Sequence, residues 1–112
     1  MGDHLAADRA LDALGDPQRR AIVRQLGTGP HPVGQLASRL PIGRPAVSKH
    51  LKVLEGAGIV RHRSVGTRNL YELAPEALVP LQQWLVETWD ATLSAFADHV
   101  RDRRPTDPEP EP

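Results

Sequence analysis

A short stretch of the sequence combines cations with small hydrogen-bonding side chains. Arg44, Ser48, Lys49 and Lys52 lie within a stretch that contains no acid. Guanidinium and ammonium groups bind phosphates, and a guanidinium or hydroxyl can also reach the edge of a base. Ala46 is small enough to lie against a thymine methyl group. A carboxylate would repel phosphate at the same place. These residue types predict contact with a polyanion such as duplex DNA.

The charge distribution along the chain supports this interpretation. The chain as a whole has no net charge, with fourteen Arg and Lys against fourteen Asp and Glu. Residues 19–68 nevertheless contain ten of the cations and one acid, Glu55, which gives a formal charge of +9. The rest of the chain therefore carries −9. A basic middle between acidic ends is typical of a polyanion-binding module. Arg-rich surfaces also occur without any such role, but here the charge coincides with a motif.

The apolar residues around this stretch predict two short helices joined by a turn. The first begins at Pro32 and carries apolar residues at positions 33, 36, 37 and 40. Residues 41–43 are too few for anything but a turn, and a second helix follows at about 44–57. Two helices joined in this way form a helix-turn-helix, whose second helix enters the major groove with its N-terminal half. The same geometry also serves as plain helix packing, so both interpretations stay open here.

The periodicity changes after Gly58, where the sequence predicts a β-hairpin at about 59–73. We expect strands near 59–64 and 69–73 with a turn at Gly66. Arg61, Arg63 and Arg68 lie on this hairpin. A basic hairpin directly after a recognition helix predicts a wing that contacts the DNA backbone or the minor groove.

Two helices precede these elements and one long helix follows them. Apolar residues at positions 7, 10, 11 and 14 predict the first helix. Asp16 as a cap and Pro17 at the first helical position predict the second. A long helix is expected at about 75–104. Residues 1–104 are therefore predicted to form one domain, and the acidic, proline-rich residues 105–112 a disordered tail.

The long helix carries an apolar stripe that includes Trp84 and Trp89, two of the four aromatic residues in the chain. So small a domain cannot bury the whole stripe, and an exposed stripe of this size is unusual in a monomer. We therefore expect a homodimer, whose two recognition helices would meet successive major grooves roughly 34 Å apart. The predicted interface residues are Leu5, Leu11, Leu14, Leu81, Trp84, Leu85, Trp89, Leu93 and Phe96.

Several classes of function lack support in the sequence. The chain has no cysteine, which excludes disulfides and thiolate metal sites. The N-terminus does not resemble a signal peptide, and no apolar run has membrane-spanning length, so a cytoplasmic protein without membrane contact is expected. We find no nucleophile–base pair and no glycine-rich phosphate loop, since Ser48 and His50 do not face each other on a helix. An enzyme is therefore not expected, and no cofactor is indicated.

The motifs together resemble a known family. The segments "LGDPQRRAIVRQL" and "GQLASRLPIGRPAVSKHLKVLEGAGIVRHRSVGTRNLYEL", followed by the Trp-bearing helix, resemble the ArsR/SmtB family of winged helix-turn-helix transcriptional repressors. The resemblance covers about residues 5–100. It implies a mainly α fold with a small β-hairpin, the topology ααααββα and a homodimer paired through its first and last helices. It also implies a sequence-specific repressor that binds an inverted-repeat operator through the fourth helix and the wing.

The resemblance carries DNA contacts to Gly43, Arg44, Ser48, Lys49 and His50, and to the wing near Arg63, Gly66 and Arg68. Gly43 could contribute only its main chain. The spacing of His50 puts it at the edge of the apolar stripe, which favours a packed, hydrogen-bonded role over a base contact. The full set of predicted DNA-binding residues is Gly43, Arg44, Pro45, Ala46, Ser48, Lys49, His50, Lys52, Arg61, Arg63, Gly66 and Arg68.

Two alternatives remain from the sequence. The first is a metal-responsive repressor, in which His4, His99 and Asp98 would meet across the dimer. No ligand set has the spacing of the known sites in the family, so no metal site is predicted, and His31 and His62 are expected to be solvated. The second is a winged-helix module for protein–protein contact, which would bind DNA without salt dependence or not at all. No residue identifies an inducer.

Overall fold

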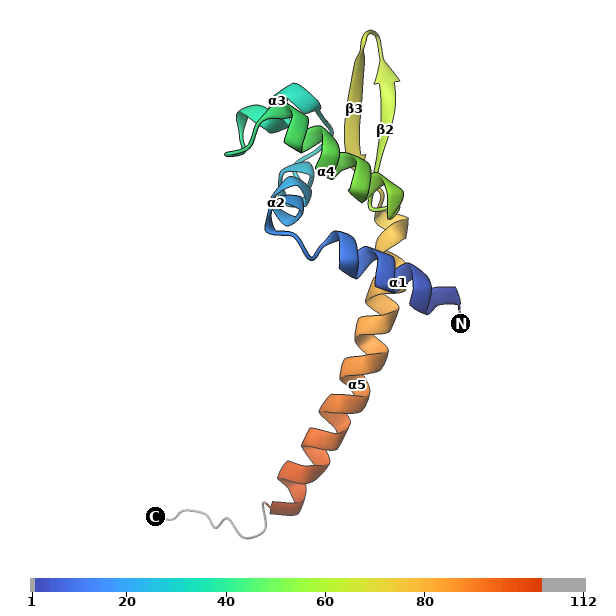
Figure 1. The fold of residues 1–112 in the computed structure, drawn as a ribbon. Helices are drawn as coiled ribbons and strands as arrows, with labels where there is room; N and C mark the ends of the chain where they lie inside the picture. The colour runs from blue at the N-terminus through green and yellow to red at the C-terminus, as the bar shows by residue number, and fades with distance from the viewer. Residues whose placement is uncertain (1, 104–112) are drawn as a thin grey trace.

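The structure, a computed structural model, describes residues 2–103 and the side chains of residues 5–102. The side chain of His4 and the predicted tail at 105–112 lie outside the described residues. The elements are α1 (Gly2–Ala13), α2 (Pro17–Leu26), β1 (His31–Pro32), α3 (Val33–Ser38), α4 (Arg44–Gly56), β2 (Val60–Val65), β3 (Arg68–Leu73), the 3-10 helix η1 (Pro75–Ala77) and α5 (Leu78–Arg103). The first four helices and the hairpin form a head, from which α5 extends as a rod (Figure 1). The predicted order of helices and strands is confirmed, with β1 and η1 added to it.

The start of α2 follows from its sequence. Asp16 has an extended backbone, and its Oδ1 accepts hydrogen bonds from the backbone N–H groups of Gln18 at 2.7 Å and Arg19 at 3.2 Å. Pro17 occupies the first turn, where its missing N–H costs nothing. Partial burial acts to raise the pKa of Asp16, but these backbone hydrogen bonds and the nearby charges of His50 and Arg19 lower it below its usual value. The predicted cap is confirmed.

We expect Asp16→Ala to lower the free energy of unfolding at about pH 7, because two backbone N–H groups lose their acceptor. The pKa of Asp16 is lowered in the folded protein. Its contribution is therefore complete above the ordinary carboxyl pKa and is lost as the pH falls through the lowered value. Urea unfolding of Asp16→Ala and wild type at about pH 7 and about pH 3 measures this. Asp16→Asn is the control that keeps the cap. If Asp16→Ala lowered the free energy of unfolding by the same amount at both pH values, the charge-assisted cap would be contradicted.

The helix-turn-helix consists of α3 and α4. Helix α3 ends at Ser38 and is shorter than the helix expected to run to Leu40. The turn between them ends at Gly43, whose extended backbone (φ −77°, ψ 165°) precedes α4, with Pro45 in the first turn of the helix. At the other end, Ile59 N–H bonds to the carbonyl of Leu54, so the chain passes directly from α4 into β2. This short connection sets the position of the hairpin relative to α4.

The hairpin belongs to a three-stranded antiparallel sheet with the order β1-β3-β2. Strand β1 pairs only His31 with Tyr71 and Pro32 with Leu70. Two residues cannot show the alternation that predicts a strand, so β1 was not expected. Strands β2 and β3 turn at Gly66 and Thr67. Gly66, the first residue of this turn, has a φ of 64°, whereas the second, Thr67, does not have a positive φ. A two-residue turn with a positive φ at its first residue alone is of type II′.

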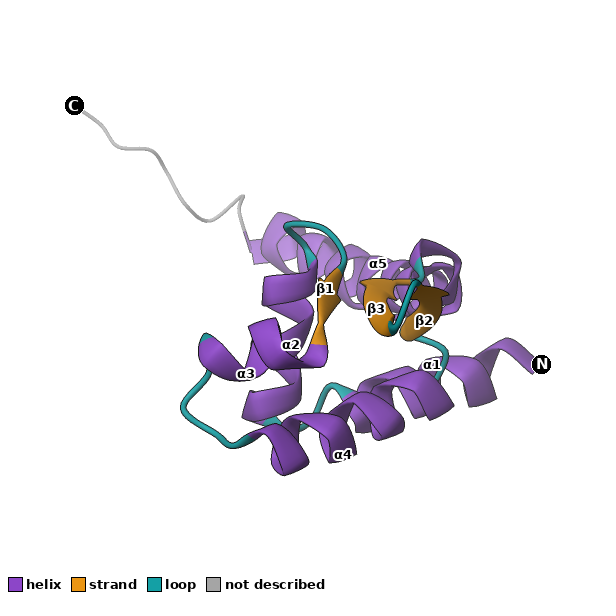
Figure 2. Cartoon of the chain, turned by 90° about the horizontal axis from the view of Figure 1, so that it is seen from above, coloured by secondary structure: helices purple, strands orange, loops and turns teal. Residues whose placement is uncertain are grey.

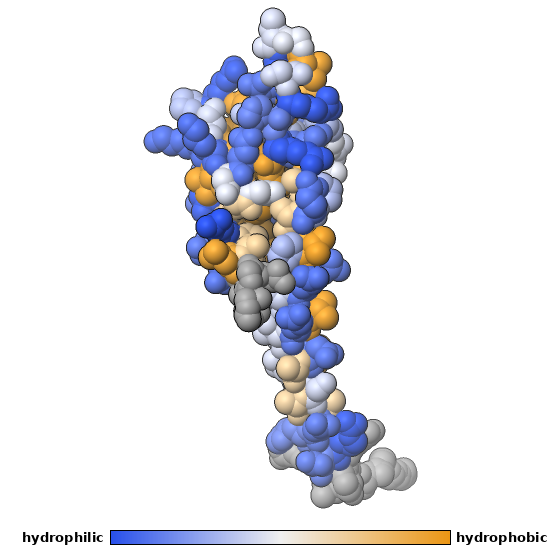
Figure 3. Space-filling view, turned by 90° about the vertical axis from the view of Figure 1, so that its right-hand side faces the viewer, coloured by the Kyte–Doolittle hydropathy of each residue, from blue (hydrophilic) through white to orange (hydrophobic). Residues whose placement is uncertain are grey.

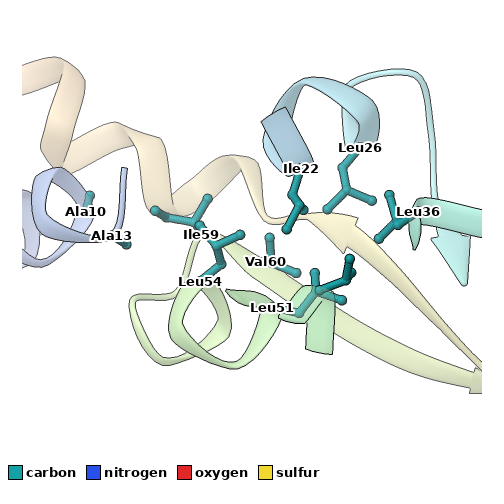
Figure 4. Packing of buried hydrophobic residues seen from close by; sticks show 10 residues of the cluster. Ala10, Ala13, Ile22, Leu26, Leu36, Leu51, Leu54, Ile59 and Val60 are labelled. Atoms are coloured by element: carbon teal, nitrogen blue, oxygen red, sulfur yellow. The ribbon is translucent and has the colours of Figure 1, made fainter. Parts of the chain in front are cut away.

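The core lies where α2, α3 and α4 meet the base of the sheet. Its largest fully buried side chains are Ile22, Leu36, Val47, Leu51, Leu54, Ile59 and Val60. They point toward one another from four elements and the α4–β2 connection (Figure 4). Burial of this cluster orients α4, because one side of the helix packs inward and the other must face outward.

Helix α5 packs against α1 near the head and then extends beyond it. Leu14 and Leu81 pack against the core, so these two predicted interface residues are partly buried within the protomer. Trp84 is half-buried, whereas Leu5 and Leu11 on α1 are exposed. We call the exposed apolar face of α5 the α5 stripe, and it consists of Leu85, Val86, Trp89, Leu93, Phe96 and Val100. Hydrophobic patches recur along this rod in Figure 3.

Candidate nucleic-acid interface

Helix α4 presents different side chains on its two sides. Val47, Leu51 and Leu54 are fully buried against the head. The exposed side carries Arg44, Pro45, Ser48, Lys49 and Lys52, with Ala46 half-buried beside them. Among the described residues, no hydrogen bond or ion pair engages the side chains of Arg44, Ser48, Lys49 or Lys52. The exposed face of α4 therefore offers three cations and a hydroxyl to an external partner.

Arg44 also reaches the first helix of the motif. Its Nη1 atom lies 3.7 Å from the position that a Cβ would occupy on Gly34, at the start of α3. The guanidinium thus extends from the start of α4 to the start of α3. The backbone N–H groups of a helix N-terminus favour anions. Arg44 is placed to bind a phosphate beside the α3–α4 turn or to reach a base from there.

A cleft of about 370 Å³ separates α4 from the wing. It is lined by Ser48, Lys49, Lys52 and Glu55 from α4 and by His62 and Tyr71 from the sheet. The view in Figure 2 shows α4 beside the hairpin, with α5 on the opposite side of the strands. One wall of the cleft is therefore the exposed face of α4, and the other is one face of the wing.

Alternation along the strands divides the wing residues between its two faces. His62 pairs across the strands with Tyr71, and Ser64 pairs with Asn69, with Ser64 Oγ 3.1 Å from Asn69 Oδ1. These residues share the face that meets α4. The opposite face carries three cross-strand pairs, which are Arg61 with Glu72, Arg63 with Leu70, and Val65 with Arg68. The wing arginines therefore do not line the cleft.

Arg61 is held by two carboxylates. Its Nε lies 3.1 Å from Glu72 Oε2 and its Nη1 lies 2.7 Å from Glu76 Oε2. Arg63 Nε lies 3.6 Å from the other oxygen of Glu72. The hydrogen bond from Arg61 keeps the pKa of Glu72 below its usual value, and the charge of Arg63 adds to this. The charge of Arg61 is therefore compensated within the protomer, because Glu72 and Glu76 follow just beyond the acid-poor segment.

The tip of the wing differs from its base. Gly66 makes the turn and Arg68 begins β3, and both are exposed. Among the described residues, Arg68 forms no ion pair. Arg68 is consequently the arginine of the wing with an uncompensated charge. It directly follows the turn of the hairpin, which protrudes from the head (Figure 1).

His50 and His62 differ from each other in their surroundings. His50 is half-buried, and its charge acts on Asp16 at the start of α2, which supports a packed position. The Nδ1 atom of His62 contacts Glu55 Oε2, and its ring lies 5.1 Å from the ring of Tyr71 between centroids. Burial and the charge of Glu55 raise the pKa of Tyr71. His62 is thus a partnered residue of the cleft, which the sequence alone did not reveal.

His31 is also partnered. Its Nε2 lies 2.9 Å from Thr28 Oγ1, and its Nδ1 lies 3.0 Å from Gln35 Oε1. His62 is exposed and His31 is partly exposed, as expected, but each ring also has a hydrogen-bonding partner. The described residues contain no group of three or more His, Asp or Glu side chains placed to hold a metal ion. Among the same residues, no helix has the length and apolar content needed to cross a membrane.

Comparison with known proteins agrees with this geometry. A family model described as a helix-turn-helix domain matches residues 14–63. The HTH-type transcriptional regulator Rv2034 of Mycobacterium tuberculosis is 47% identical over 100 residues, which cover 89% of this chain and 94% of that protein. The HTH-type transcriptional repressor SmtB of the same species is 42% identical over 73 residues, covering 65% of this chain and 54% of the repressor.

A solved structure shows the same fold. The ArsR-like transcriptional regulator from Rhodococcus sp. RHA1 superposes with a TM-score of 0.75 at 30% identity, covering 88% of this chain and 95% of the other. This chain belongs to the ArsR/SmtB family of winged helix-turn-helix, DNA-binding transcriptional regulators.

Proposed function

We propose that this regulator acts as a homodimeric repressor that binds an inverted-repeat operator through α4 and the wing tip. The observation that carries this proposal is the exposed face of α4, where Arg44, Ser48, Lys49 and Lys52 have no partner within the described residues. Donors without internal partners at the N-terminal half of a second helix suit the major groove. We assign base contacts to Arg44 and Ser48, and phosphate contacts to Lys49 and Lys52.

The remaining predicted contacts take narrower roles in this proposal. Arg68 and Gly66 at the wing tip contact the backbone or the minor groove. Arg63 contributes less, because Glu72 compensates part of its charge, and Arg61 stabilises the base of the wing. Gly43 offers its main chain, Pro45 and Ala46 allow close approach, and His50 supports α4 from the inner side. This division separates residues that read sequence from those that bind any duplex.

The homodimer is supported by the α5 stripe. Trp89 is 51% exposed and Phe96 is 62% exposed, although both are aromatic. Leu5 and Leu11 on α1 extend the exposed apolar surface beside α5. A continuous apolar face of this kind marks an interface between proteins. A second copy that pairs α1 and α5 symmetrically would bury it and fix the separation of the two recognition helices.

The experiment that tests this function measures binding to the DNA upstream of the regulator's own gene, by footprinting and by fluorescence anisotropy over a range of salt concentrations. We expect a protected inverted repeat and a log Kd that changes with log salt by about 0.9 for each neutralised phosphate. Random duplex DNA of equal length is the control. The absence of any DNA binding, or binding without salt dependence, would favour a protein–protein module instead.

We expect Arg44→Ala and Ser48→Ala to change sequence preference. Loss of a base contact costs about 1–3 kcal/mol on the cognate site and much less on random DNA. Anisotropy titrations with a set of operator duplexes, each changed at one base pair, measure this preference. Lys49→Ala serves as the comparison, because loss of a phosphate contact weakens binding to all sequences. An equal loss on cognate and random DNA for Arg44→Ala would contradict its assignment to a base.

We expect Arg68→Ala and Arg61→Ala to behave differently although both remove one arginine from the wing. Arg68→Ala should weaken binding to every duplex and reduce the salt slope by about 0.9 per protomer. Arg61→Ala should leave the salt slope nearly unchanged, because Glu72 and Glu76 already compensate that charge. Salt titrations of both variants against one duplex distinguish the two positions. Equal salt slopes for the two variants would refute the assignment.

A further inference from the structure

The DNA-facing cleft contains one carboxylate. Glu55 is the only acid within residues 19–68, and it lines the cleft together with Lys49 and Lys52. A carboxylate at this position would repel the phosphates that the lysines attract. Its side chain is only 32% exposed, and its Oε2 contacts Nδ1 of His62 on the opposite wall. His62 therefore determines whether the charge of Glu55 is cancelled.

The hydrogen bond between His62 and Glu55 does not depend on whether His62 is charged. Because Nδ1 faces the carboxylate, it donates a hydrogen bond to Glu55 whether or not His62 carries a second proton. Gain or loss of the proton at Nε2 then changes the charge of the pair by one unit without breaking the contact. A protonated His62 cancels Glu55 and leaves the two lysines to act on DNA. A neutral His62 leaves one negative charge in the cleft.

The groups that face His62 are Glu55, Lys49 and Lys52 from α4 and Tyr71 from β3. Its strand neighbours Arg61 and Arg63 lie on the other face of the wing. Burial and the charge of Glu55 raise the pKa of Tyr71, so its hydroxyl stays neutral near pH 7. Histidine is the side chain that ordinarily changes charge between about pH 5 and 8. His62 is the one histidine among the residues that line the cleft.

We propose that His62 is a positioning residue of the DNA-binding cleft that links operator binding to proton uptake by cancelling the charge of Glu55. The inference rests on the proposed function, since it concerns the same cleft. A phosphate beside the cleft favours the protonated form of His62, so the DNA complex binds more protons than the free protein. By linkage, affinity for DNA must then fall as the pH rises. The limit is one proton per protomer, or up to about tenfold in Kd per pH unit for each cleft engaged.

Variants at the two positions separate this charge effect from a structural one. His62→Gln keeps an N–H donor for Glu55 but cannot carry a charge, so it mimics the neutral state. His62→Lys keeps a cation that stays protonated across the range. Glu55→Gln removes the negative charge that His62 cancels. His31→Gln is the matched control, because His31 belongs to the same sheet, on β1, but lies outside the cleft and is not among the predicted DNA-binding residues.

The test measures Kd for one operator duplex by fluorescence anisotropy from about pH 6 to about pH 8 at constant ionic strength, where histidine titrates. We expect Kd to rise with pH for wild type and His31→Gln. His62→Gln should bind weakly with little pH dependence, and His62→Lys should bind tightly with little pH dependence. Glu55→Gln should keep tight binding at the high end of the range. The salt slope of wild type should also be steeper at low pH.

A wild-type Kd that is constant across this range, or an unchanged pH dependence in His62→Gln, would overturn the inference while leaving the proposed function intact. Failure of wild type to bind DNA at any pH would overturn both. Circular dichroism at each pH confirms that the variants are folded. If His62→Gln does not fold, Glu55→Gln decides the matter, because a pH dependence equal to that of wild type in this variant would also overturn the inference.

Discussion

Trp89→Asp should yield a folded monomer in place of the proposed homodimer. Trp89 is 51% exposed at the middle of the α5 stripe, between Leu85 and Leu93. In a dimer paired through α5, the substitution would bury a carboxylate from each copy in an apolar interface without a partner, which is strongly unfavourable. The protomer itself should remain folded, because Trp89 is not part of the buried core. Sedimentation velocity measures the change of mass, and circular dichroism measures the retained helix.

The loss of pairing should also weaken operator binding. A dimer engages two half-sites at once, and removal of this linkage typically reduces affinity by about 10²–10⁴-fold. Glu87→Ala is the matched control, since Glu87 is exposed on the same helix but lies off the α5 stripe. It should sediment as wild type does and bind the operator with the same Kd. A Trp89→Asp variant that stays dimeric would refute the α5 interface.

Leu51→Ala should destabilise the protein more than any surface substitution on α4. Leu51 is fully buried between α4, α2 and the base of the sheet, so removal of its side chain leaves a cavity as well as losing burial. Such changes cost about 2–5 kcal/mol. For a domain of this size, that corresponds to a fall in Tm of about 10–30 °C. Because α4 is oriented by this packing, DNA binding should also weaken at temperatures where the variant is still folded.

Thermal unfolding at a fixed protomer concentration measures this effect, since the stability of a dimer depends on concentration. Val53→Ala is the control, because Val53 lies on the same helix but is 46% exposed. It should change the free energy of unfolding by less than about 0.5 kcal/mol. A similar loss of thermal stability in Leu51→Ala and Val53→Ala would show that the orientation of α4 does not depend on Leu51.

The sequence predicted the elements of this fold because the signals that define them are local. Asp16 and Pro17 define the start of α2, and the spacing of Val47, Leu51 and Leu54 defines the buried side of α4. Gly66 defines the turn of the wing, within one residue of each predicted strand end. Strand β1 was not predicted, because two residues cannot show periodicity. Helix α3 was predicted too long, because Leu40 continues the apolar spacing beyond the last helical residue.

The composition of the candidate site was harder to predict because it depends on pairs that are distant in sequence. The cations of α4 followed from helical spacing alone. The pairing of Arg61 with Glu76, fifteen residues away, depends on the register of β2 with β3 and on η1. The contact of Glu55 with His62 depends on the path of the chain from α4 into β2. Charge counts along a sequence cannot show which charges compensate one another.

Site-directed DNA cleavage shows whether the exposed face of α4 lies in the major groove of the operator. The chain has no cysteine, so Ser48→Cys provides a single attachment point for an iron chelate. We expect cleavage of the operator at two places related by twofold symmetry and roughly 34 Å apart. Ser94→Cys, exposed on α5, is the control and should cleave little. Cleavage from position 94 but not from position 48 would show that α4 does not enter the major groove.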